Sequence, residues 1–290
     1  MFYIFYALIW TISWLPLRVL YVISDLLYPL IYHIARYRRK VVRRNLINSF
    51  PDYSIKQIKE IEKKFYHFFC DLLIEIIRLL HISEKEMKRR ITFENLDLLF
   101  EHAKSGKSVM LMSGHYCNWE WAIKLCMYTP HDFPFLPVYQ RLRNRHFESL
   151  IRKLRNRFGA ICVEKDNLVR KIVEMKTTGE MGIFGMASDQ SPRARYIRYR
   201  MNFLNQDTPV FLGTEQLAKK YDYPVYYLDI KRVKRGYYHA VVIPIASNPT
   251  ETEEYEITKK FMFILEKNIR EQPEFWLWSH NRWKHSKKVV

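Results

Sequence analysis

The sequence lacks the stretches that would connect separate domains. It contains only 8 glycines in 290 residues, and no segment is rich in glycine, serine and proline together. Internal repeats and low-complexity segments are absent as well. A chain of this length can bury one large core. We therefore expect one α/β domain, preceded by an N-terminal extension.

Cysteine is also scarce, and the spacing of the four cysteines excludes some common uses of this residue. Cys70, Cys117, Cys126 and Cys162 form no C-x-x-C pair and lie in apolar segments. Such cysteines are typical of a reduced core in a domain that faces the cytoplasm. Cys117 closely follows His115 and is an alternative nucleophile, although no feature of the sequence marks it as a stabilised thiolate.

Acidic residues are too few to balance the basic ones. Lys and Arg total 48 while Asp and Glu total 30, which gives a formal net charge of +18. This charge predicts an anionic partner, and a membrane surface, a nucleic acid or an acidic protein would each satisfy it. The sequence lacks a helix-turn-helix, RNA-recognition or zinc signature. Aromatic and cationic residues nevertheless alternate from Trp276 to Lys284, as in single-strand binders, so nucleic-acid binding is a rival hypothesis.

Charged residues are absent from Met1 to Leu17, and apolar residues dominate again as far as Ala35. The segment has no basic start and no small-residue cleavage site, which argues against a secretory signal. Either residues 2 to about 22 cross the bilayer obliquely, or two helices interrupted at Pro16 enter one leaflet as a hairpin. A pair of buried core helices is a third interpretation. We expect residues 1–35 to attach the chain to a membrane.

Six cations follow this segment directly. They lie within nine residues and are Arg36, Arg38, Arg39, Lys40, Arg43 and Arg44. A basic cluster beside an apolar segment follows the positive-inside rule and attracts anionic head groups, at about 1 kcal/mol per residue. An ordinary solvated helix face is the alternative. We therefore expect the main domain, residues 36–290, on the cytoplasmic side of a membrane.

The central motif is KSVMLMSGHYCNWEWAIKLC, residues 107–126. Its apolar run Val109 to Met112 is short and ends at a Ser-Gly turn, which predicts a buried strand. Asn118 is placed to cap a helix that follows. His115 would then lie on the turn that leaves the sheet, and Glu120 near a helix N-terminus, where negative charge is favoured.

His115 and Glu120 are residue types suited to activating an alcohol. A carboxylate that accepts from one ring nitrogen fixes the tautomer, and the other nitrogen is then a base toward a substrate hydroxyl. The spacing itself is weak evidence, because His81 and Glu86 repeat it in a polar stretch without the strand and the turn. A histidine with a purely structural role is the alternative interpretation of His115.

The rest of the chain alternates helices and strands. Residues 54–82 begin with a capping box and carry apolar side chains at helical spacing, which predicts a long helix in the core or along an acyl-chain groove. Further strands are expected at 133–139, 182–187, 225–232 and 237–245, and further helices at 144–157, 168–177, 211–221 and 258–271. Polar and basic residues of 144–157 would face the same turn as His115 and could hold a phosphate or a thioester carbonyl.

Six stretches occur in an order that resembles one family. They are RRKVVRRNLINSFPD, SGHYCNWE, VYQRLRNRHFESLIRKLRNRFG, the Asp189-Gln190 pair before a basic loop, Phe203 to Ala218, and PEFWLWSHNRWK. Together with the apolar N-terminus, they resemble the bacterial lipid A biosynthesis acyltransferases of the lysophospholipid acyltransferase superfamily, and the resemblance covers nearly the whole chain. It implies an α/β fold with a central mixed, mostly parallel sheet flanked by helices, as in glycerolipid acyltransferases.

The resemblance also implies roles for particular residues. SGHYCNWE is similar to the family's H-x4-[D/E] motif, so His115 would be the general base and Glu120 its orienting carboxylate. The implied substrate-binding residues are Asn144, Arg155, Asp189 and Arg282. The sequence departs from the family at Gln140-Arg141, where Arg-Pro often follows the tyrosine, so that position receives no role. The chemistry needs no metal and no organic cofactor, because a thioester supplies the driving force.

The reaction implied by the resemblance is O-acyl transfer at the bacterial inner membrane. The donor would be an acyl carrier protein thioester, or acyl-CoA as in some relatives, and the acceptor a hydroxyl of a lipid A precursor or similar glycolipid. Alternative acceptors are a lysophospholipid, glycerol phosphate or an aminolipid, and a catalytically inactive membrane scaffold is a further possibility. On this interpretation residues 36–290 form the catalytic domain, which meets an anionic membrane surface and no nucleic acid.

Overall fold

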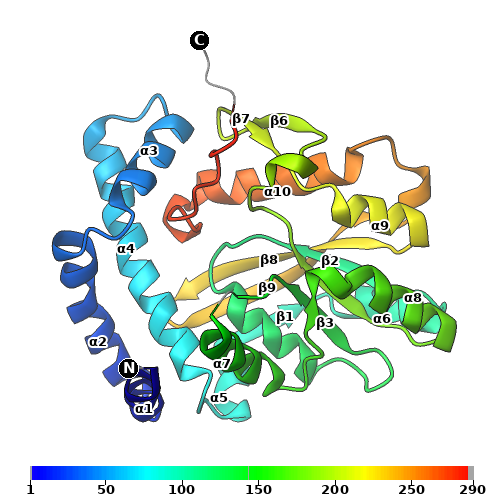
Figure 1. The fold of residues 1–290 in the computed structure, drawn as a ribbon, viewed down its shortest axis with the longest axis horizontal. Coiled ribbons are helices and arrows are strands. Elements are labelled where there is room, and N and C mark those ends of the chain that lie inside the picture. The colour runs from blue at the N-terminus through cyan, green and yellow to red at the C-terminus, as the bar shows by residue number, and fades with distance from the viewer. Residues whose placement is uncertain (1, 143, 287–290) are drawn as a thin grey trace.

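The computed structural model describes residues 2–142 and 144–286, whose main sheet has seven strands in the order β1-β9-β8-β2-β5-β3-β4 (Figure 1). Neighbouring strands are parallel except β8 and β9, which are antiparallel. The strands are β1 Ile91–Glu94, β2 Val109–Ser113, β3 Phe135–Tyr139, β4 Val163–Glu164, β5 Ile183–Ala187, β8 Val225–Lys234 and β9 Tyr237–Ala246. This arrangement confirms the expected fold class.

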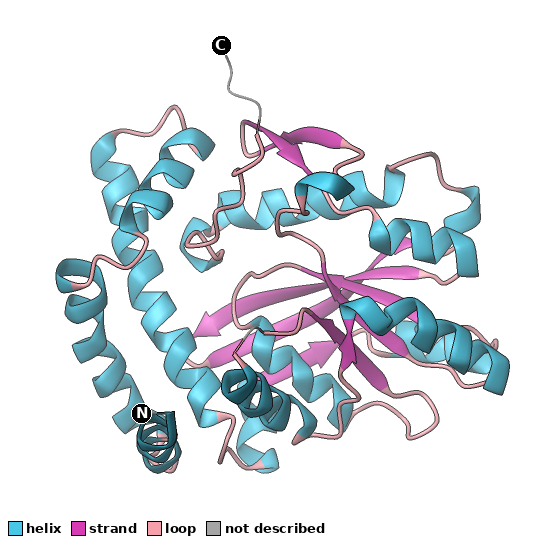
Figure 2. Ribbon diagram, viewed as in Figure 1, coloured by secondary structure: helices cyan, strands magenta, loops and turns pink. Residues whose placement is uncertain are grey.

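Helices flank the strands on both sides (Figure 2). They are α3 Arg39–Ser49, α4 Ile55–Arg78, α5 Glu84–Arg90, α6 Asp97–Lys104, α7 Arg145–Asn156, α8 Leu168–Thr178, α9 Gly213–Tyr221 and α10 Glu256–Glu271. In Figure 1, α9 and α10 lie above the sheet, while α4 crosses beside the end of β8. A separate antiparallel pair, β6 Arg200–Phe203 and β7 Gln206–Pro209, lies above α10.

The long predicted helix is α4, and it begins with the expected capping box. The Ser54 hydroxyl accepts from the Gln57 backbone N–H, and the Gln57 side chain accepts from the Ser54 backbone N–H. Its apolar side chains enter the core, together with the buried carboxylates Glu62, Asp71 and Glu75. Glu75 accepts hydrogen bonds from Tyr21 at 2.7 Å, Tyr238 at 2.7 Å and the side-chain amide of Asn118 at 2.6 Å. Glu75 therefore connects the N-terminal helices, the sheet and the loop that follows β2.

The N-terminal segment forms two helices, α1 Phe2–Ile12 and α2 Leu17–Pro29, and a π-helical turn, η1 Leu30–Ile34. The break at residues 13–16 means that residues 2–22 do not form one continuous helix. Figure 1 shows α2 along the outer side of α4, where Leu17 and Leu20 are buried. Residues 17–34 are long and apolar enough to cross a membrane. Only 22% of this stretch is buried against the rest of the protein, so most of it faces outward. Many large apolar side chains of this segment face outward, namely Leu8, Trp10, Trp14, Val19, Val22, Leu26, Leu30 and Ile34.

The basic cluster that follows is largely paired within the protein. Arg39 and Arg43 both bind Glu62, a carboxylate with 0% exposure, at 2.9 and 2.7 Å. Arg38 donates to the carbonyl of Ser279, and Arg44 donates to Asn281. Four of the six cations therefore hold α3 against α4 and against the C-terminal motif, and the attraction of this cluster to anionic head groups stays a prediction.

Candidate active site

The site lies where two neighbouring parallel strands end. β2 and β5 pair in register up to Ser113 and Ala187, and the Ser188 backbone N–H donates to the Ser113 carbonyl. The carboxyl ends of parallel strands meet at one edge of a sheet, where polar side chains gather into sites. His115 follows β2 and Asp189 follows β5, so the fold brings together two residues that are 74 positions apart.

Asp189 holds His115 through two contacts. Its Oδ1 lies 2.6 Å from the ring Nδ1, and its Oδ2 accepts from the His115 backbone N–H at 3.0 Å. The indole N–H of Trp276 donates to the same Oδ2 at 2.8 Å. Burial alone would raise the pKa of Asp189, but the charge and hydrogen bonds of His115 and the bond from Trp276 lower it to about 2. Asp189 is therefore an ionised acceptor, and Nδ1 of His115 carries the proton.

The second ring nitrogen of His115 faces Gln190. The side-chain nitrogen of Gln190 lies 3.0 Å from Nε2. Because Nδ1–H donates to Asp189, Nε2 is the lone-pair nitrogen and accepts from the Gln190 amide. Burial lowers the pKa of His115, but the charge and hydrogen bond of Asp189 and the charge of Glu120 outweigh this and raise it. The His115 side chain is 18% exposed, so the imidazole is not sealed in the core.

The structure corrects the role that we expected for Glu120. Within the described residues, the ring nitrogens of His115 contact Asp189 and Gln190, and Glu120 binds Arg155 instead. Nε and Nη2 of Arg155 meet the two carboxylate oxygens at 3.1 and 2.7 Å, a bidentate pair. Burial raises the pKa of Glu120, but Arg155 and His115 outweigh it and keep it below its ordinary value. Glu120 therefore acts on His115 through its charge rather than through a hydrogen bond.

Comparison with known proteins identifies the family. Residues 1–285 match the sequence pattern of the bacterial lipid A biosynthesis acyltransferases. The chain belongs to this family. It is 23% identical to the lipid A biosynthesis palmitoleoyltransferase of Escherichia coli over 300 aligned positions, which cover 94% of this chain and 91% of that one. The lipid A biosynthesis acyltransferase of Haemophilus influenzae is 25% identical over 183 positions, which cover 62% of this chain and 56% of that relative.

Membership identifies the chain as an acyltransferase. The lipid A acyltransferase fold brings four of the predicted residues together: His115, Glu120, Arg155 and Asp189. Asn144 lies apart from them, because it is exposed and caps α7 by accepting from the backbone N–H groups of His146 and Phe147. It supports the site indirectly, since α7 carries Arg155.

Arg282 lies in the interior behind this site. It is 0% exposed, and within the described residues none of its guanidinium nitrogens has a hydrogen-bond partner. Burial lowers its pKa to about 10, against the opposing effect of the Asp189 charge. Arg282 is therefore a buried cation within electrostatic reach of the His115 and Asp189 pair, and its substrate-binding role stays a prediction.

Gln190 and Trp276 both contact the His115 and Asp189 pair, although neither residue was predicted to have a role. The signal was present, because Gln190 follows Asp189 directly and Trp276 belongs to the terminal motif. The alternative nucleophile, Cys117, is fully buried, and burial raises the pKa of its thiol well above the ordinary value. This acyltransferase would therefore hold Cys117 as a neutral thiol.

Two further observations bear on the alternatives. Trp276 and Trp278 are 3% and 0% exposed, so two of the three tryptophans of the terminal motif are not available to stack on bases. Within the described part of the chain, no group of three or more His, Cys, Asp or Glu side chains is arranged to hold a metal ion. The burial of these two tryptophans weakens the support for a nucleic-acid-binding interpretation.

Proposed function

We propose that this chain transfers a fatty acyl group from a thioester donor to a hydroxyl of a lipid A precursor or a similar glycolipid, with His115 as the general base. The observation that carries this proposal is the 2.6 Å contact between Asp189 and Nδ1, which leaves Nε2 of a partly exposed imidazole as a lone-pair base. A carboxylate, an imidazole and a substrate hydroxyl in series are the usual means of making an alcohol nucleophilic.

The proposed reaction proceeds in two steps. Nε2 of His115 removes the hydroxyl proton while the alcohol oxygen forms a bond to the thioester carbonyl carbon, and the carbonyl oxygen becomes an oxyanion. The oxyanion then reforms the carbonyl as the C–S bond breaks, and the imidazolium returns the proton to the leaving thiolate. Asp189 stabilises the imidazolium between the two steps, because it remains ionised and accepts from Nδ1–H throughout.

Arg155 is suited to stabilise the oxyanion. Its Nε and Nη2 hold Glu120, and its Nη1 has two further N–H groups that could point toward substrate. Glu120 fixes the guanidinium and balances its charge near His115. In this mechanism Glu120 orients the arginine and raises the pKa of the imidazole through space.

Arg155→Lys tests this role. An ammonium group cannot reproduce the bidentate contact, so we expect kcat to fall about 10²-fold, the usual loss for one oxyanion donor. Arg152→Lys is the matched control, because Arg152 is an exposed residue of the same helix. An unchanged kcat in Arg155→Lys would contradict the assignment of oxyanion stabilisation to this residue.

Gln190 must release Nε2 when the acceptor hydroxyl arrives, and its amide is then placed to bind the hydroxyl oxygen. Gln190→Glu tests the tautomer assignment. A carboxylate at this position would accept from protonated Nε2, raise the pKa of His115, and move the acid limb of the kcat/KM profile to higher pH. Gln190→Leu removes the donor to neutral Nε2 without adding charge, so it should move the limb upward much less than Gln190→Glu does. Profiles that move alike in both variants would contradict the proposed state of Nε2.

We further propose that the exposed apolar face of α1 and α2 inserts into the inner membrane, with residues 36–290 on the cytoplasmic side. Exposed tryptophans at positions 10 and 14 support this, because tryptophan favours the membrane interface. The donor would be an acyl carrier protein thioester or acyl-CoA, and the net charge of +18 agrees with an acidic carrier.

The donor and acceptor are tested together by transfer of labelled acyl groups in detergent. Acyl carrier protein and CoA thioesters would each be combined with lipid A precursors, lysophospholipid, glycerol phosphate and an aminolipid. We expect transfer onto the lipid A precursor. Unchanged lipid A in the mass spectrum of a deletion strain would contradict this acceptor and favour a glycerolipid or an aminolipid.

A further inference from the structure

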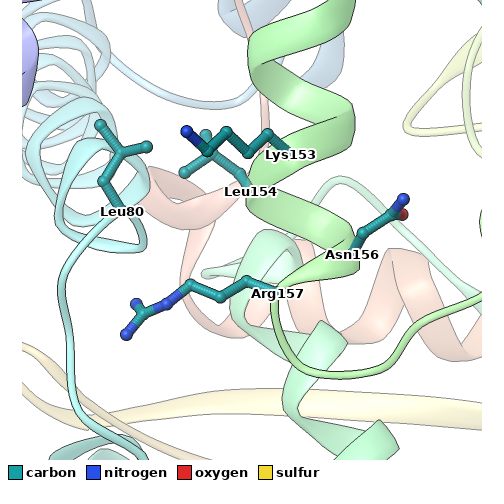
Figure 3. A pocket seen from close by; sticks show the side chains of 5 residues that line it. All are labelled: Leu80, Lys153, Leu154, Asn156 and Arg157. Atoms are coloured by element: carbon teal, nitrogen blue, oxygen red, sulfur yellow. The ribbon is translucent and has the colours of Figure 1, made fainter.

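A basic pocket lies outside the active site, between the end of α4 and the last turn of α7. Its volume is about 500 Å³, and its lining consists of Leu80, Lys153, Leu154, Asn156 and Arg157. Figure 3 shows Lys153 and Arg157 extending from the α7 segment toward Leu80. The pocket thus combines two cationic side chains with apolar walls.

The charge of this pocket is poorly neutralised. Among the described residues, neither Lys153 nor Arg157 forms an ion pair, although the charge of Glu84 acts on Arg157. Arg157 donates from one nitrogen to the Leu79 carbonyl at 2.6 Å, which keeps its guanidinium beside the end of α4. A guanidinium and an ammonium group together match the several acceptor oxygens of a phosphate.

The pocket also adjoins the apolar surface of the N-terminal helices. His81, the neighbour of Leu80, stacks on Trp14 with ring centroids 4.0 Å apart and meets Trp10 edge-on at 5.2 Å. These tryptophans are 57% and 42% exposed. Burial and the charges of Arg157, Arg78 and Lys153 lower the pKa of His81, which agrees with their closeness. Interfacial tryptophans lie at the depth of lipid head groups, so the pocket would lie at that depth too.

We propose that this pocket binds the phosphate of an anionic lipid head group in the membrane on which α1 and α2 lie. The inference rests on the proposed membrane attachment and gives it an orientation. Arg39 and Arg43 share the buried Glu62 and Arg38 binds a carbonyl of the C-terminal motif, whereas Lys153 of the pocket has no such partner among the described residues. A bound head group would hold α7, and with it Arg155, at a fixed height above the bilayer.

Vesicle flotation of the full-length protein tests the proposal. The probes are vesicles of phosphatidylcholine alone, of phosphatidylcholine with phosphatidic acid, and of phosphatidylcholine with enough oleic acid to match the surface charge. We expect the wild type to bind the phosphatidic acid vesicles about tenfold more tightly than the neutral ones, and to gain less from oleic acid. Equal gains from both anionic lipids would overturn the assignment to phosphate.

Lys153→Glu is the decisive variant, and Lys267→Glu is its matched control. Both residues are exposed lysines, but Lys267 lies on α10. We expect Lys153→Glu to remove the roughly tenfold gain and to keep binding to neutral vesicles, and Lys267→Glu to keep both. Asn156→Asp should also remove the gain from phosphatidic acid, because it adds a negative charge to the pocket. Arg157 is left unchanged, because its hydrogen bond to the Leu79 carbonyl anchors the end of α4. The same loss in Lys267→Glu would reduce the effect to overall charge and overturn the proposal.

Two further measurements distinguish a lipid phosphate from a free phosphate and from the phosphates of acyl-CoA. Inorganic phosphate that abolishes the gain at moderate concentration would assign the pocket to a free anion. A raised KM for acyl-CoA in detergent, with unchanged vesicle binding in Lys153→Glu, would assign it to the acyl donor. Either result overturns the lipid assignment. A wild type that binds no vesicles contradicts the membrane attachment itself, whereas transfer in detergent that survives His115→Ala contradicts only the proposed chemistry.

Discussion

Replacement of His115 by alanine is expected to lower kcat/KM for acyl transfer by about 10³ to 10⁴-fold, because the variant retains no group that can accept the hydroxyl proton. The measurement is transfer of a labelled acyl chain in detergent, at saturating and at limiting acceptor. Since the loss arises in the chemical step, kcat should fall while the binding of the acceptor changes little.

His131→Ala is the control for this experiment, because His131 is an exposed histidine outside the site. It should retain full activity. A His115→Ala variant that also retains activity, with an unchanged melting temperature, would show that the chain does not use an imidazole base. The structural role that the sequence left open for His115 would then be the better interpretation.

Asp189→Asn is the second change with a large expected effect. An amide can donate to Nδ1, which would favour the tautomer with its proton on Nε2 and remove the lone pair that accepts the substrate proton. We expect kcat to fall about 10³ to 10⁴-fold, as for the corresponding change in serine hydrolases. Asp132→Asn, an exposed residue, is the matched control.

The pH profile separates this role from a structural one. Asp189 raises the pKa of His115, so the wild-type enzyme should lose activity as the pH falls through a value above 6.5, where the base becomes protonated. Loss of the carboxylate removes that stabilisation of the imidazolium, and the acid limb of Asp189→Asn should move to lower pH. A melting temperature that falls while the limb stays in place would assign Asp189 a structural role only.

The position of the proposed base, His115, could be predicted from the sequence, but its pairing with Asp189 could not. The apolar run of β2 and the glycine turn after it predict a strand edge, and His115 lies there. Glu120 was a plausible partner because it is close in sequence. The actual partner, Asp189, is supplied by β5, and only the order of strands in the sheet reveals that β5 lies beside β2.

The basic cluster illustrates the same limit. Its composition and its place after an apolar segment indicate a membrane contact, and nothing local reveals that Glu62 will be buried among these arginines. The long helix α4 was predictable because its capping box and its spacing of apolar residues are local signals. Interactions between distant segments depend on how helices pack, and a single sequence does not encode that in a readable pattern.

The C-terminal motif joins segments that lie far apart in the chain. Trp276 donates to Asp189, the Leu277 backbone N–H donates to the His115 carbonyl, and Asn45 binds the carbonyls of Trp278 and His280. The loop after β2, the loop after β5 and helix α3 are therefore fastened to one short segment. A substitution that displaces this segment should disturb the geometry of His115 and Asp189 together, although it lies far from both in sequence.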